Sequence, residues 1–118
     1  MRFLFNTHKY RARAVKIDGI RFASMAEAGR YRVLKIMQAG GEISGLQLQP
    51  KFLLQDKFSH GGETIRAIHY VADFQYLDKS GRKVVEDVKG MKTEAYLLKR
   101  KFFLAKYGQD YDFREIGR

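Results

Sequence analysis

Apolar and polar residues alternate along one central stretch of the chain, and this pattern predicts two neighbouring β-strands. The first run, residues 68–77, is rich in aromatic and β-branched residues, and the second, residues 83–88, is short and rich in valine. The four residues between them, 78–81, favour a turn. Gly81 suits the left-handed position of a three-residue hairpin loop. We therefore expect an antiparallel hairpin.

The register of this hairpin brings charged residues together at its open end. With a three-residue loop, Asp78 pairs with Arg82, and counting back from that pair places Asp73 opposite Asp87. Directly opposed residues point to the same face, with Cβ atoms about 4.5–5.5 Å apart. Lys89 emerges on that face too, because side chains alternate with period two. Two carboxylates and an amine are therefore expected to converge.

Two facing carboxylates repel each other and raise one pKa unless a cation lies between them. Mg²⁺ and Mn²⁺ favour carboxylate, carbonyl and water oxygens, so a divalent cation would resolve the repulsion. The alternative is that Asp73 and Asp87 are solvated strand residues and that Lys89 neutralises one of them. The apolar residues around them favour the metal site.

A first helix is predicted from Ser24 to about Gln38. Ser24 and Glu27 form a capping box, and Gly40-Gly41 ends the helical pattern. Glu27 thus has an ordinary structural role, since it closes the box and favours the helix N-terminus.

A second helix is predicted from Glu94 to about Lys106, ended by Gly108. Its expected buried side consists of Leu97, Leu98, Phe102 and Ala105. The helix and the residues before it are strongly basic, which indicates either a solvated polar face or a phosphate-contacting surface; the cations are Lys92, Lys99, Arg100, Lys101 and Lys106.

The remaining segments predict shorter elements. We expect residues 15–22 to form a strand pair that turns at Asp18-Gly19, and residues 42–45 to form a turn. Residues 46–55 predict a strand that is broken at Pro50. Residues 56–64 predict a flexible loop, and residues 111–116 predict a closing edge strand.

Length and composition indicate a single small domain. The chain has 118 residues, which we divide into a basic N-terminal arm with its short hairpin (1–21) and one domain (22–118). There is no cysteine, which excludes disulfides and thiolate metal sites. The apolar runs are too short to span a bilayer and the start lacks a secretory signal pattern, so we expect a cytoplasmic protein with no membrane contact.

The net charge points to a polyanionic partner. Lys and Arg number 23 against 13 Asp and Glu, a formal charge of +10. Nucleic acid is the default partner for such a domain. A membrane surface is a weaker alternative, because the cations are spread over the chain, and a basic soluble protein without such a role is another. Arg11 and Arg13 in the N-terminal arm are candidate phosphate contacts.

The sequence contains no pattern typical of a zinc site, a nucleotide-binding loop or a serine-protease triad. His8, His60 and His69 have no zinc-ligand spacing, and each is better interpreted as a surface or structural residue. The glycine pairs fit no dinucleotide or nucleotide loop, so no small-molecule cofactor is expected. No Ser/His/Asp set stands out.

The order of elements and motifs resembles the PD-(D/E)XK, or restriction-endonuclease-like, nuclease superfamily over residues 22–116. Within it, the chain is similar to small phage-encoded proteins related to Holliday junction resolvases. The motifs that carry the resemblance are Ser24-Met25-Ala26-Glu27-Ala28, Leu48-Gln49-Pro50-Lys51-Phe52, Tyr70-Val71-Ala72-Asp73-Phe74 and Val85-Glu86-Asp87-Val88-Lys89-Gly90. The resemblance implies an α/β (α+β) fold with a mixed central sheet flanked by helices, in the order αβββαβ.

The resemblance also implies roles for particular residues. Asp73, Asp87 and the Val88 carbonyl would bind Mg²⁺ or Mn²⁺, and Glu27 would ligate directly or through water. Lys89 would orient or help to deprotonate the attacking water and stabilise the charge that develops on phosphorus. Lys92, Thr93 and the group Lys99-Arg100-Lys101 fall where DNA phosphates would run.

Two positions depart from the family pattern. Ala72 precedes Asp73 where the family name has proline, which affects strand geometry more than chemistry. Glu86 precedes Asp87; alternation sends it to the opposite face in a structural or surface role, whereas a one-residue bulge would exchange the two.

The leading hypothesis is a metal-dependent DNA endonuclease that selects branched DNA and acts as a homodimer with two active sites. A non-catalytic DNA-binding accessory of recombination on the same fold is the alternative, and the intact acidic set argues against it. RNA cleavage is a third. The sequence leaves open whether the substrate is a junction, flap, nick or specific duplex.

Overall fold

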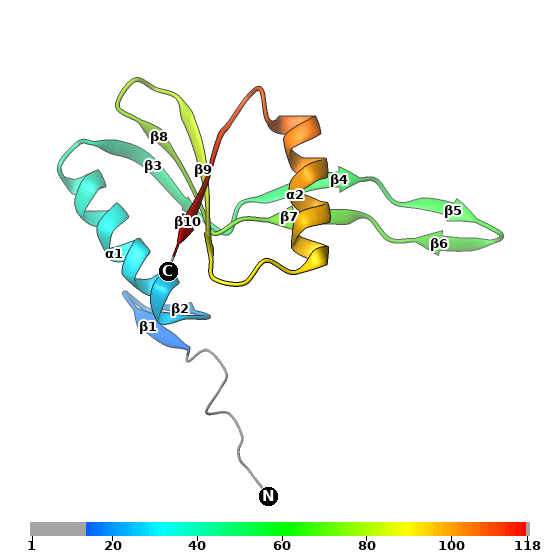
Figure 1. The fold of residues 1–118 in the computed structure, drawn as a ribbon, viewed down its shortest axis with the longest axis horizontal. Coiled ribbons are helices and arrows are strands. Elements are labelled where there is room, and N and C mark those ends of the chain that lie inside the picture. The colour runs from blue at the N-terminus through cyan, green and yellow to red at the C-terminus, as the bar shows by residue number, and fades with distance from the viewer. Residues whose placement is uncertain (1–13, 118) are drawn as a thin grey trace, which may run out of the picture.

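The computed structural model describes residues 14–117 and contains two helices and ten strands in that range. Figure 1 shows a small body that carries a long two-stranded projection. The elements are β1 (Val15–Ile17), β2 (Ile20–Phe22), α1 (Met25–Ala39), β3 (Ile43–Leu48), β4 (Lys51–Gln55), β5 (Phe58–His60), β6 (Glu63–Ile65), β7 (Ile68–Val71), β8 (Phe74–Asp78), β9 (Lys83–Lys89), α2 (Glu94–Tyr107) and β10 (Asp112–Gly117).

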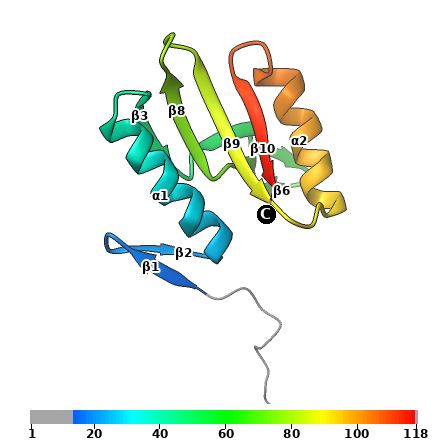
Figure 2. The same ribbon diagram turned by 60° about the vertical axis from the view of Figure 1, so that its left-hand side comes forward.

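A four-stranded mixed sheet forms the centre of the body, with the strand order β10-β9-β8-β3. Strands β3, β8 and β9 are antiparallel neighbours, whereas β10 runs parallel to β9 after the crossover through α2. The two helices lie on either side of this sheet in Figure 2. The expected α+β class with a mixed sheet and flanking helices is therefore confirmed.

The predicted register of the central hairpin is confirmed from its loop to the Phe74–Glu86 pair; Asp73 lies just outside the paired residues. Leu77 pairs with Lys83 and Phe74 with Glu86, as the three-residue loop requires. Gly81 has a φ of 88°, a left-handed conformation that glycine adopts without a Cβ clash. Asp78 donates its N–H to the Arg82 carbonyl at 2.8 Å, which closes the loop.

The first strand of the hairpin is not continuous, in contrast to the prediction. It bends at Ala72-Asp73, so that β8 stays in the central sheet and β7 pairs with β4 instead. The facing strand bends at the same level, at Gln49-Pro50, where Pro50 lacks an N–H. Two backbone hydrogen bonds hold the bends together. The Gln49 N–H donates to the Asp73 carbonyl (2.9 Å), and the Ala72 N–H donates to the Pro50 carbonyl (3.1 Å).

The segment predicted as a flexible loop, residues 56–64, is instead the end of a β-hairpin. Strands β5 and β6 pair with each other, and both turn glycines, Gly61 and Gly62, have positive φ. This conformation suits a tight two-residue hairpin turn. We call the hairpin formed by β4, β5, β6 and β7, residues 51–71, the ribbon; Figure 1 shows it projecting away from the body.

The predicted turn at residues 42–45 is also wrong, because β3 already begins at Ile43. Gly45, with a φ of 65°, lies where the pairing of β3 with β8 shifts between Ser44 and Gln47. The glycine therefore marks a bulge within a strand, not a turn between elements.

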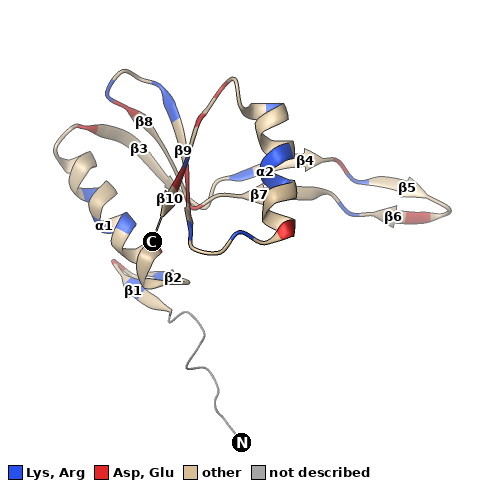
Figure 3. Ribbon diagram, in the orientation of Figure 1, with Lys and Arg blue, Asp and Glu red and all other residues tan. Residues whose placement is uncertain are grey.

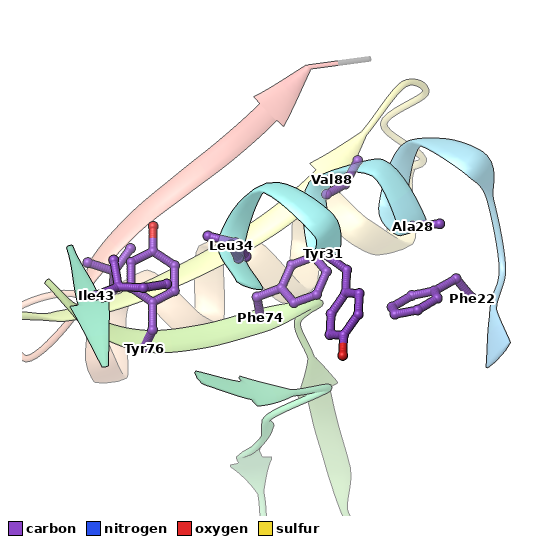
Figure 4. Packing of buried hydrophobic residues seen from close by; sticks show 9 residues of the cluster. Phe22, Ala28, Tyr31, Leu34, Ile43, Phe74, Tyr76 and Val88 are labelled. Atoms are coloured by element: carbon purple, nitrogen blue, oxygen red, sulfur yellow. The ribbon is translucent and has the colours of Figure 1, made fainter. Parts of the chain in front are cut away.

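The first helix agrees with its prediction. Ser24 is the N-cap, and its Oγ accepts the Glu27 N–H at 3.1 Å. Buried residues Ala28, Tyr31 and Leu34 lie on the side that faces the sheet. They join the larger core cluster shown in Figure 4, with Phe22, Ile43, Phe74, Tyr76, Val84 and Val88.

The second helix has the predicted bounds but buries a different side. Its buried residues are Tyr96 and Phe103, while Leu98 and Phe102 keep more than half of their surface exposed (55% and 53%). Phe103 packs instead into an aromatic cluster with Phe52 and Tyr70 of the ribbon base. Tyr96 and Phe103 lie on one stripe of the helix in the sequence, but the ribbon on which this stripe packs was not predicted.

The short N-terminal hairpin β1–β2 turns at Asp18-Gly19 as predicted, with positive φ at both residues. It packs on the body through Val15, Ile17 and Ile20. Arg11 and Arg13, predicted to contact phosphate, lie outside the described residues. Within the described range, neither helix is long and apolar enough to cross a membrane.

Candidate active site

Asp73 and Asp87 meet where the central hairpin opens. Asp73 lies in the bend before β8, and its Oδ2 accepts the Val88 N–H at 2.6 Å. Asp87 is 2% exposed and follows Glu86, whose carbonyl accepts the Asp73 N–H at 3.1 Å. The predicted convergence of these two carboxylates is therefore present in the structure.

Lys89 lies on the same face as Asp87, as alternation predicts. Its Nζ is 3.0 Å from Asp87 Oδ1 and 4.3 Å from the centre of the Tyr96 ring. The Tyr70 hydroxyl donates to Asp87 Oδ2. The ion pair with Lys89 is the contact that this buried carboxylate's Oδ1 makes among residues 14–117, where it has no further hydrogen bond. One oxygen of Asp87 is thus held by Tyr70 and the other by the ion pair with Lys89.

Glu27 approaches the same place from the first turn of α1. Together with Asp73 and Gln49 it lines a cavity of about 80 Å³ beside the bend. A single water needs a cavity of only about 10–15 Å³ on this measure, so several waters fit here. Among the described residues, no three acidic, histidine or cysteine side chains are grouped closely enough to hold one metal ion by themselves.

The electrostatics of the site disfavour negative charge. Burial raises the pKa of Asp73 to about 6; the Val88 N–H opposes this shift, and the neighbouring Glu27 adds to it. Burial also raises the pKa of Asp87, against the hydrogen bond from Tyr70, and the charge of Asp73 raises it further. Both carboxylates would be stabilised by a cation placed between them.

Glu86, the competing acidic residue, lies on the opposite face of β9. It is fully buried and accepts two hydrogen bonds from Arg30, from Nε at 2.7 Å and from the terminal nitrogen at 2.6 Å. Tyr76 donates a further hydrogen bond to it. The pairing of β8 with β9 runs without a bulge as far as Phe74–Glu86, and beyond that pair Asp73 accepts the Val88 N–H and lies near Asp87. The role of Glu86 is structural.

The basic residues predicted to contact DNA divide into two groups. Lys92 and Arg100 are ion-paired with Glu115 at 3.1 and 2.7 Å, and the Thr93 hydroxyl caps α2 by accepting the Tyr96 N–H at 3.1 Å. Lys99 and Lys101 are exposed on α2. Of the predicted DNA contacts on α2, Lys99 and Lys101 are therefore the ones with exposed side chains.

A family model described as a protein of unknown function, DUF1064, matches residues 7–115. The chain belongs to the DUF1064 family. The match includes Glu27, Asp73, Asp87 and Lys89 and both helices. No curated protein and no solved structure matches the chain.

Gln49 of this DUF1064 chain lines the candidate site, a position that was not predicted for it. It has a φ of 52°, unusual for a residue with a Cβ, and its side chain lines the cavity beside Glu27 and Asp73. Non-glycine residues held in this region often lie at functional sites. The available signals were the adjacent proline, already expected to break the strand, and the place of Gln49 in one of the motifs that carry the resemblance.

Glu115 is a second residue that the sequence did not single out. On β10 it is the neighbour of Asp87 in the parallel pairing, and it accepts a hydrogen bond from the Tyr96 hydroxyl at 2.5 Å. Tyr96 in turn lies against Lys89. Glu115 therefore fixes the aromatic ring on which the candidate catalytic lysine of the DUF1064 chain rests.

We expect Glu115 to make stability depend on pH in the acidic range. Burial raises its pKa, but hydrogen bonds from Tyr96, Arg100 and Lys92 outweigh burial and lower it from 4.5 to about 2. A lowered pKa means that the stabilisation is complete above pH 4.5 and is lost as the pH falls toward 2. Thermal unfolding of Glu115→Gln between these pH values should show a shallower pH dependence than that of the wild type. Equal slopes would contradict this role.

Proposed function

We propose that this DUF1064 chain is a metal-dependent endonuclease that hydrolyses phosphodiester bonds in DNA. The observation that carries the proposal is the convergence of Asp73, Asp87 and Lys89, with Glu27 beside them, at the open end of one hairpin. A domain that served only to bind a polyanion would gain nothing from buried carboxylates facing phosphate.

The residues present fit a divalent cation. Asp87 Oδ1 is buried and has only its ion pair with Lys89 among the described residues, and carboxylate oxygens are the ligands that Mg²⁺ and Mn²⁺ prefer. Asp73, Asp87 and the Val88 carbonyl would hold the ion. Since no three acidic side chains close on one point in the described chain, Glu27 would act through water held in the neighbouring cavity. Mg²⁺ usually keeps several waters.

When bound, such a cation polarises the phosphate and lowers the pKa of water. Lys89 would position the attacking water and stabilise the charge that develops on phosphorus, as a cation held next to the reacting group can do. Its contact with the Tyr96 ring and with Asp87 limits the positions of its Nζ. Tyr70 holds the second oxygen of Asp87 and so sets the direction of the first.

The charge of the chain supports nucleic acid as the substrate. A net charge of +10 favours binding to phosphate, and the domain is too small for an elaborate base-reading module. We propose branched DNA, of the Holliday junction type, as the preferred substrate, and a homodimer as the form that makes paired cuts.

The test is cleavage of labelled four-way-junction, flap and linear duplex DNA with Mg²⁺, Mn²⁺ or EDTA. Lys89→Ala should reduce the metal-dependent rate by about 10²–10⁴-fold, the range for loss of a group that assists proton transfer. Lys83→Ala is the matched control, because Lys83 lies on the same strand and also rests on a tyrosine ring, Tyr111, but at the far end from the site. It should cleave like the wild type.

The ranking of the three substrates decides between a junction-selective enzyme and a general nuclease. Failure of the wild type to cut any DNA with either metal, while DNA binding is retained and unchanged in Lys89→Ala, would reject the enzyme. A non-catalytic accessory of recombination would then be the better interpretation.

A further inference from the structure

The ribbon is the largest feature of the molecule that the proposed active site does not use. Residues 55–66 are all exposed, and β5 and β6 pair only with each other. Isolated two-stranded hairpins are marginally stable in water, so a projecting one contributes little to the core. The base of the ribbon, by contrast, is held firmly: Tyr107 and Lys106 of α2 donate to the Leu53 carbonyl at 2.8 and 3.1 Å.

One face of the ribbon is basic. A shallow groove along it is lined by Lys51, Lys57, Thr64, Arg66, Ala67 and His69. Neither of the two acidic residues of the ribbon, Asp56 and Glu63, lines this groove. The groove therefore gathers all three Lys and Arg residues of the ribbon and leaves its acids elsewhere.

The opposite face of the ribbon tip has a different character. Phe58 and Ile65 are direct partners, so their side chains share a face, and strand alternation places the Ser59–Thr64 pair on the other face, with the groove. By the same alternation the His60–Glu63 pair lies with Phe58 and Ile65. The tip of the ribbon thus has one face of cations and hydroxyls and one face with apolar groups, His60 and Glu63, and the first of these faces suits a polyanion.

The dimensions of the ribbon match those of a DNA groove. The major groove of B-DNA is about 12 Å wide and admits a two-stranded ribbon. From Lys51 to Gly61 the ribbon extends about 30 Å at about 3.3 Å per residue, close to one helical turn of DNA. It starts two residues after Gln49, which lines the candidate active site.

We propose that the ribbon is a DNA-binding arm that lies in the major groove about one turn away from the cleaved bond, with Lys51, Lys57 and Arg66 contacting phosphates. This inference rests on the proposed function, because it names how the same site would hold its duplex. The DNA contact would thus be made by a segment distinct from α2 and from the N-terminal residues.

The test is the binding of Lys57→Ala/Arg66→Ala to a DNA duplex of about three turns, in EDTA, over about 50–200 mM salt. The slope of log K against log salt should fall by about 2, one for each lost phosphate contact, and the affinity at low salt by at least about tenfold. The matched control is Arg32→Ala/Lys35→Ala, which removes the same charge from exposed positions of α1. In Figure 3, α1 and the ribbon lie at opposite sides of the body.

Equal losses in the two double variants, or no loss in either, would overturn the proposal. An RNA duplex of the same sequence should bind more weakly and show a smaller effect of the ribbon variant, because the A-form major groove is too narrow to enter. Equal effects on the two duplexes would overturn groove entry, and a ribbon effect seen only on anionic lipid vesicles would replace DNA by a membrane surface. Since binding is read without metal, failure of the ribbon and failure of the nuclease are separate results.

Discussion

Asp73→Asn is expected to abolish metal-dependent cleavage and, at the same time, to stabilise the metal-free protein at neutral pH. The loss of activity follows from the loss of a metal-binding carboxylate, which removes several kcal/mol of transition-state stabilisation, or at least about a hundredfold in rate. The gain in stability follows from electrostatics, because Asp73 is ionised at pH 7 in a place that disfavours its charge.

The sign and size of the stability change can be worked out. The pKa of Asp73 is raised from 3.8 to about 6 in the folded state, first by burial. An acid with a raised folded pKa destabilises the fold increasingly as the pH rises from 3.8 through 6, and at pH 7 the cost of ionising it is about 2–3 kcal/mol. Asparagine carries no charge, and its carbonyl can still accept the Val88 N–H.

Urea unfolding in EDTA at pH 5 and pH 7.5 measures the change, and the advantage of Asp73→Asn should be larger at the higher pH. Asp78→Asn is the matched control at the other end of β8. Hydrogen bonds from Ser80 and Arg82 lower the pKa of Asp78, so this variant should lose stability at neutral pH and keep its activity. Added Mg²⁺ should raise the melting temperature of the wild type more than that of Asp73→Asn. A less stable Asp73→Asn at pH 7.5 would show that the carboxylate is structural.

The sequence was sufficient to predict the open end of the hairpin, because that geometry depends on local features. The loop length fixed the pairing of Phe74 with Glu86, which brings Asp73 close to Asp87, and alternation fixed the positions of Lys89 and Glu86. These rules act over a few residues, and no distant contact opposes them. Capping by Ser24 defined the start of α1, and termination at Gly40 and Gly108 defined the ends of both helices, for the same reason.

The ribbon could not be foreseen, because its cause is a pair of bends that lie far apart in sequence. The break at Ala72-Asp73 falls inside a run of strand-forming residues and is explained by the facing bend at Gln49-Pro50. Once β4 and β7 leave the central sheet together, Phe52 and Tyr70 need a cover, and Phe103 of α2 supplies it. The side of α2 that carries Leu98 and Phe102 is therefore exposed, against the prediction from periodicity alone.

Arg30→Ala is expected to be the most destabilising single substitution outside the hydrophobic core. It leaves the fully buried Glu86 carboxylate without its two hydrogen bonds from the guanidinium, at 2.6 and 2.7 Å. Removing one partner of a buried ion pair costs about 3–5 kcal/mol, because an uncompensated charge remains in the interior. The exposed pair of Lys79 with Glu42 is the control, and Lys79→Ala should cost less than about 1 kcal/mol.

A double-mutant cycle in urea separates the charge from the packing. Glu86→Gln removes the charge and keeps an acceptor for Tyr76, so Arg30→Ala/Glu86→Gln should be more stable than Arg30→Ala alone. Additive losses would mean that Arg30 acts through its packing on β9.

The ion pair of Arg30 with Glu86 also matters for the candidate active site. With Glu86 fixed on the α1 face, the next residue, Asp87, must lie on the other face of β9. We therefore expect Arg30→Ala to lose metal-dependent cleavage at temperatures just below its unfolding transition, as β9 loses the contact that fixes its orientation.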